Sequence, residues 1–178
     1  QRQRLDSHKL IEEFMVLANV AAAEFLEEKK RPCMYRVHDE PSMSKIESLA
    51  EVLDSVHIRF DKGQPATPHR FNQILAKAKG TAHAQMINDV VLRSQAQAMY
   101  DPNNIGHFGL SLKRYCHFTS PIRRYADLLV HRALLRGLKP SDGALPEDSG
   151  DFVRIGEHLS VTERRAQAAE RGAMDRYS

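Results

Sequence analysis

Two neighbouring arginines, Arg123 and Arg124, follow Ser120 and Pro121 and are the residues of this chain best suited to chemistry. Ser120 has the side chain of a helix N-cap and Pro121 suits the first helical position, so the sequence predicts a helix that begins here. Both arginines would then lie in its first turn, where the helix dipole disfavours a cation by roughly 0.3–1 kcal/mol. A bound anion would remove this conflict. Phosphate fits best, because free backbone N–H groups and two guanidinium groups can bind it together.

The alternative for this arginine pair is a structural ion pair with Asp127. Arg123 is four residues from Asp127 and Arg124 is three residues from it, and both spacings bring side chains together on a helix. A single aspartate cannot neutralise two arginines. The sequence therefore favours anion binding and leaves the structural pair open.

The positive charge of the chain is concentrated around this pair. Between residues 107 and 139 a single acid, Asp127, stands against seven basic residues, namely Lys113, Arg114, Arg123, Arg124, Arg132, Arg136 and Lys139. This stretch carries +6 whereas the whole chain carries +3, so the remainder sums to −3. Local basicity is typical of a surface that meets a polyanion. Tyr115, Phe118 and Tyr125 could stack on bases, which favours nucleic acid over a merely solvated basic face.

Composition predicts one soluble, globular domain over residues 1–178. The 178 residues are 42% hydrophobic and 28% charged, enough for one sizeable core. Cys33 and Cys116 lack metal-ligand spacing, so reduced thiols in a cytoplasmic protein are expected. There is no apolar run long enough to span a membrane, and we do not expect a membrane to be a partner of the protein. Because the chain starts with Gln1 and its first methionine is Met15, we interpret it as a fragment.

Hydrophobic periodicity predicts an α+β fold that is predominantly helical, with a short strand or hairpin region. The first predicted helix, over 8–30, places apolar residues on one face at Leu10, Phe14, Leu17, Ala18, Ala21 and Phe25. Ser44 and Glu47 have capping-box spacing for a second helix. Further helices are expected over 69–79, over 82–99, from Ser120 onward and over 151–176, a strand over 33–38, loops over 61–68 and 100–106, a hairpin around Lys113 and Arg114, and a linker over 139–150.

No recognised catalytic constellation accompanies these elements. The nine histidines form no metal-binding motif, and no metal ligand is assigned in this chain. The sequence contains no glycine-rich phosphate loop and no nucleophile elbow. The residues alone therefore predict a module that binds phosphate or nucleic acid. A metal-independent phosphodiesterase that uses a pair of histidines is a third, weaker possibility.

Four segments resemble the C-terminal part of the RNB catalytic domain of the ribonuclease II superfamily. Within that superfamily they are most similar to the ribonuclease R branch. The longest is LRSQAQAMYDPNNIGHFGLSLKRYCHFTSPIRRYADLLVHR over residues 92–132. The others, in the order of the family, are DSHKLIEEFMVLANVAAAEFL, YRVHDEPSMSKI and TERRAQAAER. The resemblance implies a processive exoribonuclease that degrades single-stranded RNA, and also structured RNA, from the 3′ end to nucleoside 5′-monophosphates.

The resemblance also implies what the chain lacks. In the family, magnesium ions are held by aspartates in an earlier part of the catalytic domain, and cold-shock-type domains and an S1-type domain flank it. We therefore expect Mg²⁺ only in the complete enzyme, and we expect this chain to be inert alone, because two-metal hydrolysis needs carboxylates that fix both ions. An exposed apolar patch is expected where the missing half would pack, and through it the chain can self-associate.

The resemblance implies roles for individual residues. Arg123, and with less weight Arg124, corresponds to the arginine that grips phosphate near the scissile bond. Glu13 corresponds to a residue at the 3′-terminal nucleotide, where a carboxylate can accept from ribose hydroxyls. The resemblance implies that the backbone close to the phosphate is shaped by His117, Thr119 and Ser120. It implies that the helix is held in place by Tyr125, Asp127 and His131. The terminal helix of the family is matched by Glu163, Arg164, Arg165, Glu170 and Arg171.

The chain departs from the family at Gly172 and Ala173, where an aspartate and a larger residue are usual, which puts RNA contacts of the last turns in doubt. A second hypothesis is a non-catalytic RNA-binding module that kept these phosphate-gripping residues after losing the metal-binding half of the catalytic domain. Closely spaced aspartates upstream of Gln1 would favour the enzyme, and their replacement would favour the module.

Overall fold

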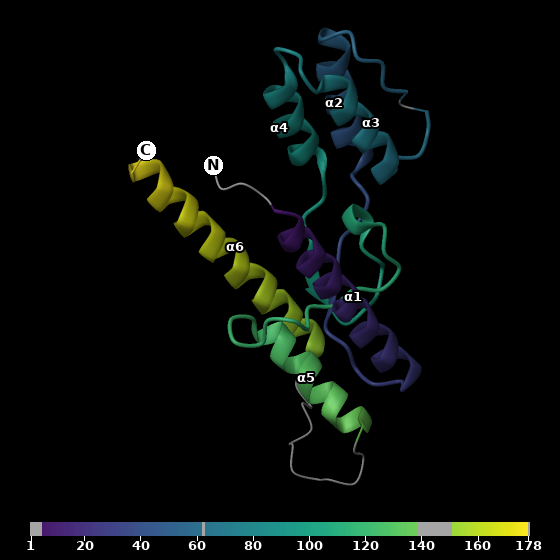
Figure 1. Ribbon diagram of the computed structural model, residues 1–178, viewed down its shortest axis with the longest axis vertical. Coiled ribbons are helices and arrows are strands. Elements are labelled where there is room, and N and C mark those ends of the chain that lie inside the picture. Colours follow the sequence, from purple (N-terminus) through teal and green to yellow (C-terminus); the bar gives the residue numbers. More distant parts are fainter. Residues whose placement is uncertain (1–4, 62, 139–150, 178) are drawn as a thin grey trace. The chain divides into compact units, whose positions relative to one another are not determined.

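The computed structural model describes residues 5–61, 63–138 and 151–177, and its fold is mainly helical with a two-stranded antiparallel sheet (Figure 1). This confirms the predicted α-rich α+β class. Its residues divide into two compact units, the first from 1–37, 99–105 and 113–178 and the second from 38–98 and 106–112. The predicted linker over 139–150 lies outside the described residues, and the single-domain organisation stays a prediction. None of the described helices has the length and apolarity to cross a membrane.

The first unit consists of helices around the small sheet. Its elements are α1 (Asp6–Glu28), β1 (Tyr35–Val37), β2 (Met99–Asp101), α5 (Tyr125–Leu138) and α6 (Phe152–Tyr177). The two strands are antiparallel, with Tyr35 opposite Asp101 and Val37 opposite Met99. The C-terminal half of α1 packs against α5 and β1, and burial of their apolar side chains forms one core, made of Ala22, Ala23, Leu26, Cys33, Tyr35, Val37, Cys116, Val130 and Ala133.

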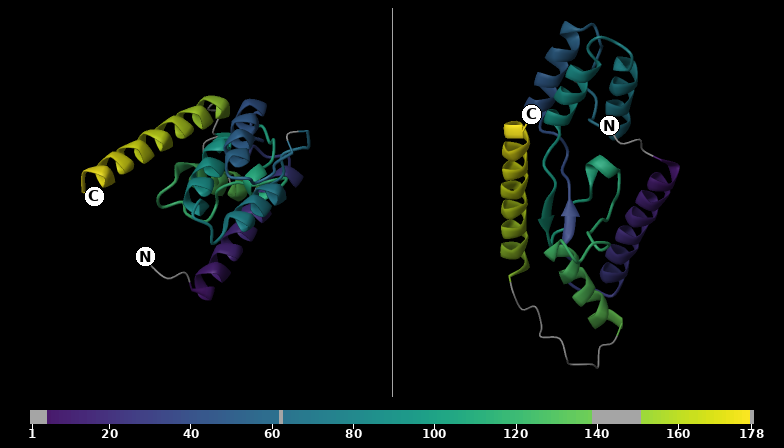
Figure 2. Two further views of the ribbon diagram at one scale, coloured as in Figure 1. Left: turned by 90° about the horizontal axis from the view of Figure 1, so that it is seen from above. Right: turned by 60° about the vertical axis from the view of Figure 1, so that its left-hand side comes forward.

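Helix α6 runs beside the sheet because small residues on one of its faces allow a close approach (Figure 2). A Cβ atom on Gly156 would lie 2.5 Å from the Tyr100 carbonyl oxygen, so only glycine fits at this point. One turn further on, Ser160 Oγ accepts the Tyr100 backbone N–H at 3.0 Å and donates to the Gly156 carbonyl at 2.8 Å. From Arg164 onward every described residue of α6 is exposed, so this half of the helix extends beyond the sheet.

The second unit is a three-helix cluster of α2 (Met43–Ser55), α3 (Pro68–Ala78) and α4 (Ala84–Ser94), with the short 3-10 helix η1 (Phe108–Leu110) against α3. Its core comes from all three helices and consists of Ile46, Leu49, Ala50, Leu53, Phe60, Phe71, Ile74, Ala78, Ile87 and Val91. His38 ties the loop at η1 to the chain after α4, because Nδ1 accepts the Gly109 N–H at 2.8 Å and Nε2 bonds the Ala96 carbonyl at 2.8 Å.

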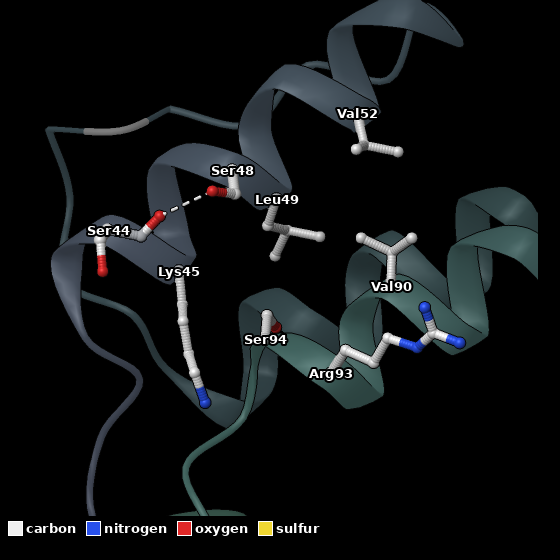
Figure 3. A pocket seen from close by; sticks show the side chains of 8 residues that line it. All are labelled: Ser44, Lys45, Ser48, Leu49, Val52, Val90, Arg93 and Ser94. Carbon is white, nitrogen blue, oxygen red and sulfur yellow. Dashed lines mark hydrogen bonds between the residues drawn. The ribbon is translucent and has the colours of Figure 1, made fainter.

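A groove of about 250 Å³ runs between α2 and α4 within the second unit. Figure 3 shows Leu49 and Val52 of α2 facing Val90 of α4. At its end, Lys45 Nζ donates to the Gln95 carbonyl at 2.7 Å, which satisfies a carbonyl at the C-terminus of α4. A cation in this place also complements the negative end of the helix dipole.

Several predicted boundaries are wrong. The helix expected from Ser120 begins at Tyr125, because Ser120 donates its backbone N–H to Asp127 Oδ1 at 2.7 Å and does not cap with its side chain. The helix expected over 82–99 ends at Ser94, and Met99–Asp101, partly expected as loop, pairs with β1.

Two further local predictions are wrong. Instead of a hairpin around Lys113 and Arg114, an isolated bridge joins His107 to Leu112. The capping box expected at Ser44 is replaced by an N-cap at Ser42, because α2 begins at Met43, two residues earlier than the pattern indicates.

The N-terminal half of α1 exposes large apolar side chains. Leu10, Ile11, Phe14 and Leu17 are 56 to 64% exposed, although three of them belong to the predicted apolar face. The buried residues of α1 lie at its other end, at Asn19, Ala22, Ala23 and Leu26. The structure therefore has the apolar patch that the sequence predicted, and we define it by these four exposed residues as the α1 patch.

Candidate functional site

The chain from residue 115 to residue 124, here called the arginine segment, is fixed by α1 and α5 before it reaches the arginines. Asn19 Oδ1 on α1 accepts the backbone N–H groups of Phe118 and Thr119 at 2.9 and 3.2 Å. On α5, His131 Nε2 bonds the Phe118 carbonyl at 2.9 Å, and its ring stacks on the Phe118 ring with centroids 4.4 Å apart. The backbone of this segment is therefore held on both sides by buried or half-buried side chains.

The carboxylate of Asp127 is the next anchor. It is fully buried and accepts from Ser120 N at 2.7 Å and from Arg124 Nη2 at 2.9 Å, both at Oδ1, while Arg124 Nε lies 2.8 Å from Oδ2. The contact between Nη2 and Oδ1 is a hydrogen bond, whereas Nε and Oδ2 are close as an ion pair without hydrogen-bond geometry. Arg124 thus realises the structural ion pair that the sequence left open.

Arg123 has a different environment from its neighbour. Its backbone N–H and that of Arg124 donate to the Ser120 carbonyl at 3.3 and 3.2 Å, so a tight turn precedes α5. Its side chain is exposed, and within residues 5–61, 63–138 and 151–177 the guanidinium makes no hydrogen bond or ion pair. A guanidinium that the fold positions but does not pair is available to an external anion.

This free guanidinium lines a cavity of about 530 Å³ in the first unit. One wall is the turn with Arg123, Arg124 and Tyr125, and the other is one face of α6, contributed by Leu159, Thr162, Glu163, Ala166, Gln167 and Glu170. The Tyr125 ring is 48% exposed. The cavity therefore combines a cation, an aromatic face and polar side chains.

Glu163 is held at the side of this cavity by β1. Arg36 donates from Nη1 and Nη2 to its two carboxylate oxygens at 2.7 and 3.0 Å, and the same guanidinium lies 4.6 Å from the centre of the Tyr100 ring. Arg36 is only 12% exposed, so this pair is stronger than a surface ion pair. It docks α6 onto the sheet and fixes where Glu163 stands.

The remaining predicted site residues do not line the cavity. Glu13 is exposed on α1, and Ser120 acts through its backbone. His117 Nδ1 bonds the Tyr100 hydroxyl at 2.8 Å. Burial raises the pKa of Tyr100, although nearby Arg36 lowers it, so the hydroxyl stays protonated. The Thr119 hydroxyl is buried and has no hydrogen-bond partner among the described residues.

Of the three aromatic rings expected to stack on bases, two are unavailable. Tyr115 is buried, and its hydroxyl accepts from Asn19 Nδ2 at 3.0 Å. Phe118 packs against the core of the first unit and against His131. Both residues flank Cys116, which is fully buried and bridges to Tyr35 of β1. Only Tyr125 remains exposed.

Sequence reasoning missed Asn19, Arg36 and Tyr100. Asn19 and Arg36 lie in the segments EEFMVLAN and YRVHDEPSMSKI, in which the sequence indicated a binding role for Glu13 alone. A polar residue in the apolar half of a helix was the available signal for Asn19, since buried amides need partners. Tyr100 carried no signal, because it was expected in a loop.

The described part of the chain contains no group of three or more His, Cys, Asp or Glu side chains placed to hold a metal ion. In the described residues, the pair of His38 and His107 is not placed for catalysis. The rings of His38 and His107 have centroids 5.0 Å apart, but both nitrogens of His38 are engaged by backbone groups, and His107 Nδ1 accepts the Leu110 N–H. The chemistry of the site therefore rests on its cations and hydrogen-bond donors.

In the described part of the first unit, helices and a turn place the exposed Arg123 at a polar cavity, and comparison with known proteins identifies the family. The RNB domain model matches residues 1–140. The chain is 43% identical over 184 residues to ribonuclease R of Escherichia coli K12 and 40% identical over 173 residues to ribonuclease R of Thermotoga maritima. The chain therefore belongs to the RNB domain family.

Solved structures agree with this assignment. RNase R of Mycoplasma genitalium in complex with ribose-methylated single-stranded RNA matches 98% of the chain with a TM-score of 0.86 at 31% identity, over 28% of its own length. The yeast pseudonuclease Ssd1 matches 93% of the chain and 20% of its own length, with a TM-score of 0.67 at 25% identity. The alignment with the Escherichia coli relative includes 98% of this chain and 23% of the relative. The alignment with the Thermotoga relative includes 95% of this chain and 24% of the relative, so the chain spans about a quarter of their length.

Proposed function

We propose that this chain forms the phosphate-gripping wall of a 3′-to-5′ exoribonuclease that hydrolyses single-stranded and structured RNA to nucleoside 5′-monophosphates. The unpaired guanidinium of Arg123 at the cavity carries the proposal. The related RNase R structures support the substrate class, because one is a complex with single-stranded RNA and another a complex with double-stranded RNA. Arg123 is the proposed catalytic residue.

In this proposal the fork of Arg123 binds the phosphate next to the scissile bond and follows its charge as the bond breaks. A donor that binds more strongly in the transition state than in the ground state raises kcat. Arg124 keeps the turn in place through Asp127, and Tyr125 offers a ring to a base. Glu13 accepts from the ribose hydroxyls of the terminal nucleotide and so favours RNA over DNA.

The other proposed substrate-binding residues act at shorter range or indirectly. His117, Thr119 and Ser120 shape the backbone that approaches the phosphate, and Glu163 presents a carboxylate at the cavity that Arg36 holds in place. Such a carboxylate can accept from a sugar hydroxyl or a base edge. Each assignment concerns the complete protein bound to RNA.

Magnesium belongs to the proposal for the complete enzyme only. The described residues offer no group of three or more His, Cys, Asp or Glu side chains that could hold it. We place the ligands in the earlier part of the catalytic domain and in the same protein as the cold-shock-type and S1-type domains. We also place the protein in the cytoplasm, which suits the free, buried thiols of Cys33 and Cys116.

An activity comparison tests the proposal. The 178-residue chain and the full-length protein are each incubated with 3′-labelled RNA, with Mg²⁺ and with EDTA. Mononucleotide release by the full-length protein that EDTA abolishes, and no release by the chain alone, is the expected result. EDTA-sensitive release of mononucleotides by the chain alone would refute the proposal that the metal ligands lie in another part of the catalytic domain.

A non-catalytic RNA-binding module is the second candidate, and the similarity to the pseudonuclease Ssd1 favours it. The two candidates differ in the metal-binding half. Closely spaced aspartates in the preceding part of the protein, together with mononucleotide release, support the enzyme. RNA binding without release by the full-length protein supports the module.

We further propose that the isolated chain self-associates through the α1 patch, because contiguous exposed apolar side chains favour association. Sedimentation velocity of the wild-type chain and of Phe14→Glu tests this. Loss of the larger species in Phe14→Glu is the expected result, and Leu92→Glu serves as a control, because Leu92 is equally apolar and 74% exposed on α4. A compact wild-type monomer at all concentrations would contradict it.

A further inference from the structure

Asn19 is a buried polar side chain that connects α1 to the arginine segment. It is 3% exposed and does not line the cavity. Its Oδ1 accepts two consecutive backbone N–H groups, from Phe118 at 2.9 Å and from Thr119 at 3.2 Å. Its Nδ2 donates to the Tyr115 hydroxyl at 3.0 Å, and its backbone carbonyl accepts from Cys116 Sγ at 3.3 Å.

These contacts give Asn19 control over the backbone just before the arginines. One oxygen that accepts two successive N–H groups fixes the direction of both peptide units. Without that oxygen, two half-buried donors would have to find new partners, since a buried donor left unpaired costs about 1–3 kcal/mol. The next residue, Ser120, provides the carbonyl that accepts from Arg123 N and Arg124 N. The turn that carries Arg123 is therefore built on the peptide units that Asn19 holds.

Asn19 also sets a distance between two proposed RNA contacts. Glu13 lies six residues earlier on the same helix, which is about 9 Å along the axis at 1.5 Å per residue. A helix is stiff over that length, so a shift of the arginine segment along α1 changes the separation between Glu13 and Arg123. The ribose contact and the phosphate contact can be satisfied together only at one such separation.

We propose that Asn19 is a positioning residue that locks the arginine segment onto α1 and so keeps the Arg123 guanidinium in line with the scissile phosphate. This inference rests on the proposed function. A misplacement of about 1 Å can cost roughly 10²-fold in rate while many contacts along the strand maintain affinity. Loss of the Asn19 carboxamide therefore lowers kcat and leaves RNA binding nearly unchanged.

The substitutions that test this separate the acceptor from the bulk of the side chain. Asn19→Asp keeps an oxygen for Phe118 N and Thr119 N, and the Tyr115 hydroxyl can reverse its bond and donate to the carboxylate. Asn19→Ala removes both functions. Tyr115→Phe removes only the hydroxyl. The matched control for loss of an asparagine is Asn72→Ala, because Asn72 is an exposed residue of α3.

The experiment uses the full-length protein, with steady-state turnover of a 3′-labelled 12-nucleotide RNA, affinity for the same RNA in EDTA, and hydrogen exchange of Phe118 and Thr119 amides. We expect Asn19→Ala to lower kcat about 10²-fold with affinity within about threefold, at temperatures where the variant is folded. Asn19→Asp and Tyr115→Phe should retain most of the turnover, Asn72→Ala all of it, and only Asn19→Ala should exchange faster at both amides.

Each other outcome overturns a different claim. Wild-type turnover in folded Asn19→Ala overturns the positioning role and leaves the proposed function intact. An equal loss of turnover and affinity, or a loss in Asn19→Asp as large as in Asn19→Ala, also overturns it, because it indicates general damage. An inactive wild-type protein refutes the proposed function itself, and the positioning role with it.

Discussion

Replacement of Arg124 with alanine should destabilise the first unit, whereas replacement of Arg123 should not. Asp127 is fully buried and Arg124 is 21% exposed, so Arg124→Ala leaves a buried carboxylate without its charge partner. Breaking a buried pair costs about 3–5 kcal/mol, and partial exposure of the arginine places this case at about 3 kcal/mol. At about 2–4 °C per kcal/mol for a chain of this size, the melting temperature should fall by roughly 6–12 °C.

Arg123 makes no hydrogen bond or ion pair within the described residues, so Arg123→Ala should change stability by at most about 0.5 kcal/mol. In the full-length protein it should instead lower kcat by about 10²–10³-fold with little loss of RNA affinity. Arg123→Lys should restore only part of that turnover, because a point charge replaces a planar fork.

Circular-dichroism melting of the chain and single-turnover kinetics of the full-length protein measure the two effects separately. Asp127→Ala is the companion variant, and it should melt earlier like Arg124→Ala. The reasoning fails if Arg123→Ala melts early and its folded fraction turns over normally, since Arg123 would then be the structural arginine.

Three further predictions concern the stability of the two units. Gly156→Ala should push α6 away from the Tyr100 carbonyl, which lowers both melting temperature and turnover, whereas Gly172→Ala in open space should not. Burial raises the pKa of Tyr35 to about 12 from 10.0. As the pH rises, Tyr35 therefore ionises first in the unfolded chain, and the free energy of unfolding should fall by up to about 2–3 kcal/mol between about pH 10 and 12. In Tyr35→Phe the free energy of unfolding, measured with urea, should change less over that pH range. His38→Ala should destabilise the three-helix unit by about 1–3 kcal/mol in urea, because Gly109 N loses its acceptor.

Elements with a local signal were predicted well. The 3.6-residue period and the terminal residues placed α1, α3 and α6 within two residues of their observed ends, and the alternation at Cys33 to His38 contains β1. Strand β2 was missed, because its residues become a strand only by pairing with β1, which lies far earlier in the chain. Local patterns carry no information on such a partner.

The candidate site shows the same division. The arginine pair and its unusual place before a helix were visible in the sequence, but the helix start was not, because the Asp127 carboxylate seven residues later accepts the Ser120 N–H. Side-chain capping at Ser120 was the local expectation, and a buried acceptor from the following helix replaced it. The roles of Asn19 and Arg36 depend on partners 99 and 127 residues away, which no spacing rule reaches.

The two interpretations of the arginine pair apply to different residues. Asp127 Oδ1 accepts from Arg124 Nη2 and from the Ser120 N–H, and Oδ2 lies 2.8 Å from Arg124 Nε. Among the described residues Arg123 makes no ion pair with this carboxylate, and it lines the cavity instead. The structural pair holds for Arg124, and it fixes the backbone of the turn from which Arg123 extends. In the proposed function the guanidinium of Arg123 supplies the charged donor with which a transition state is stabilised electrostatically.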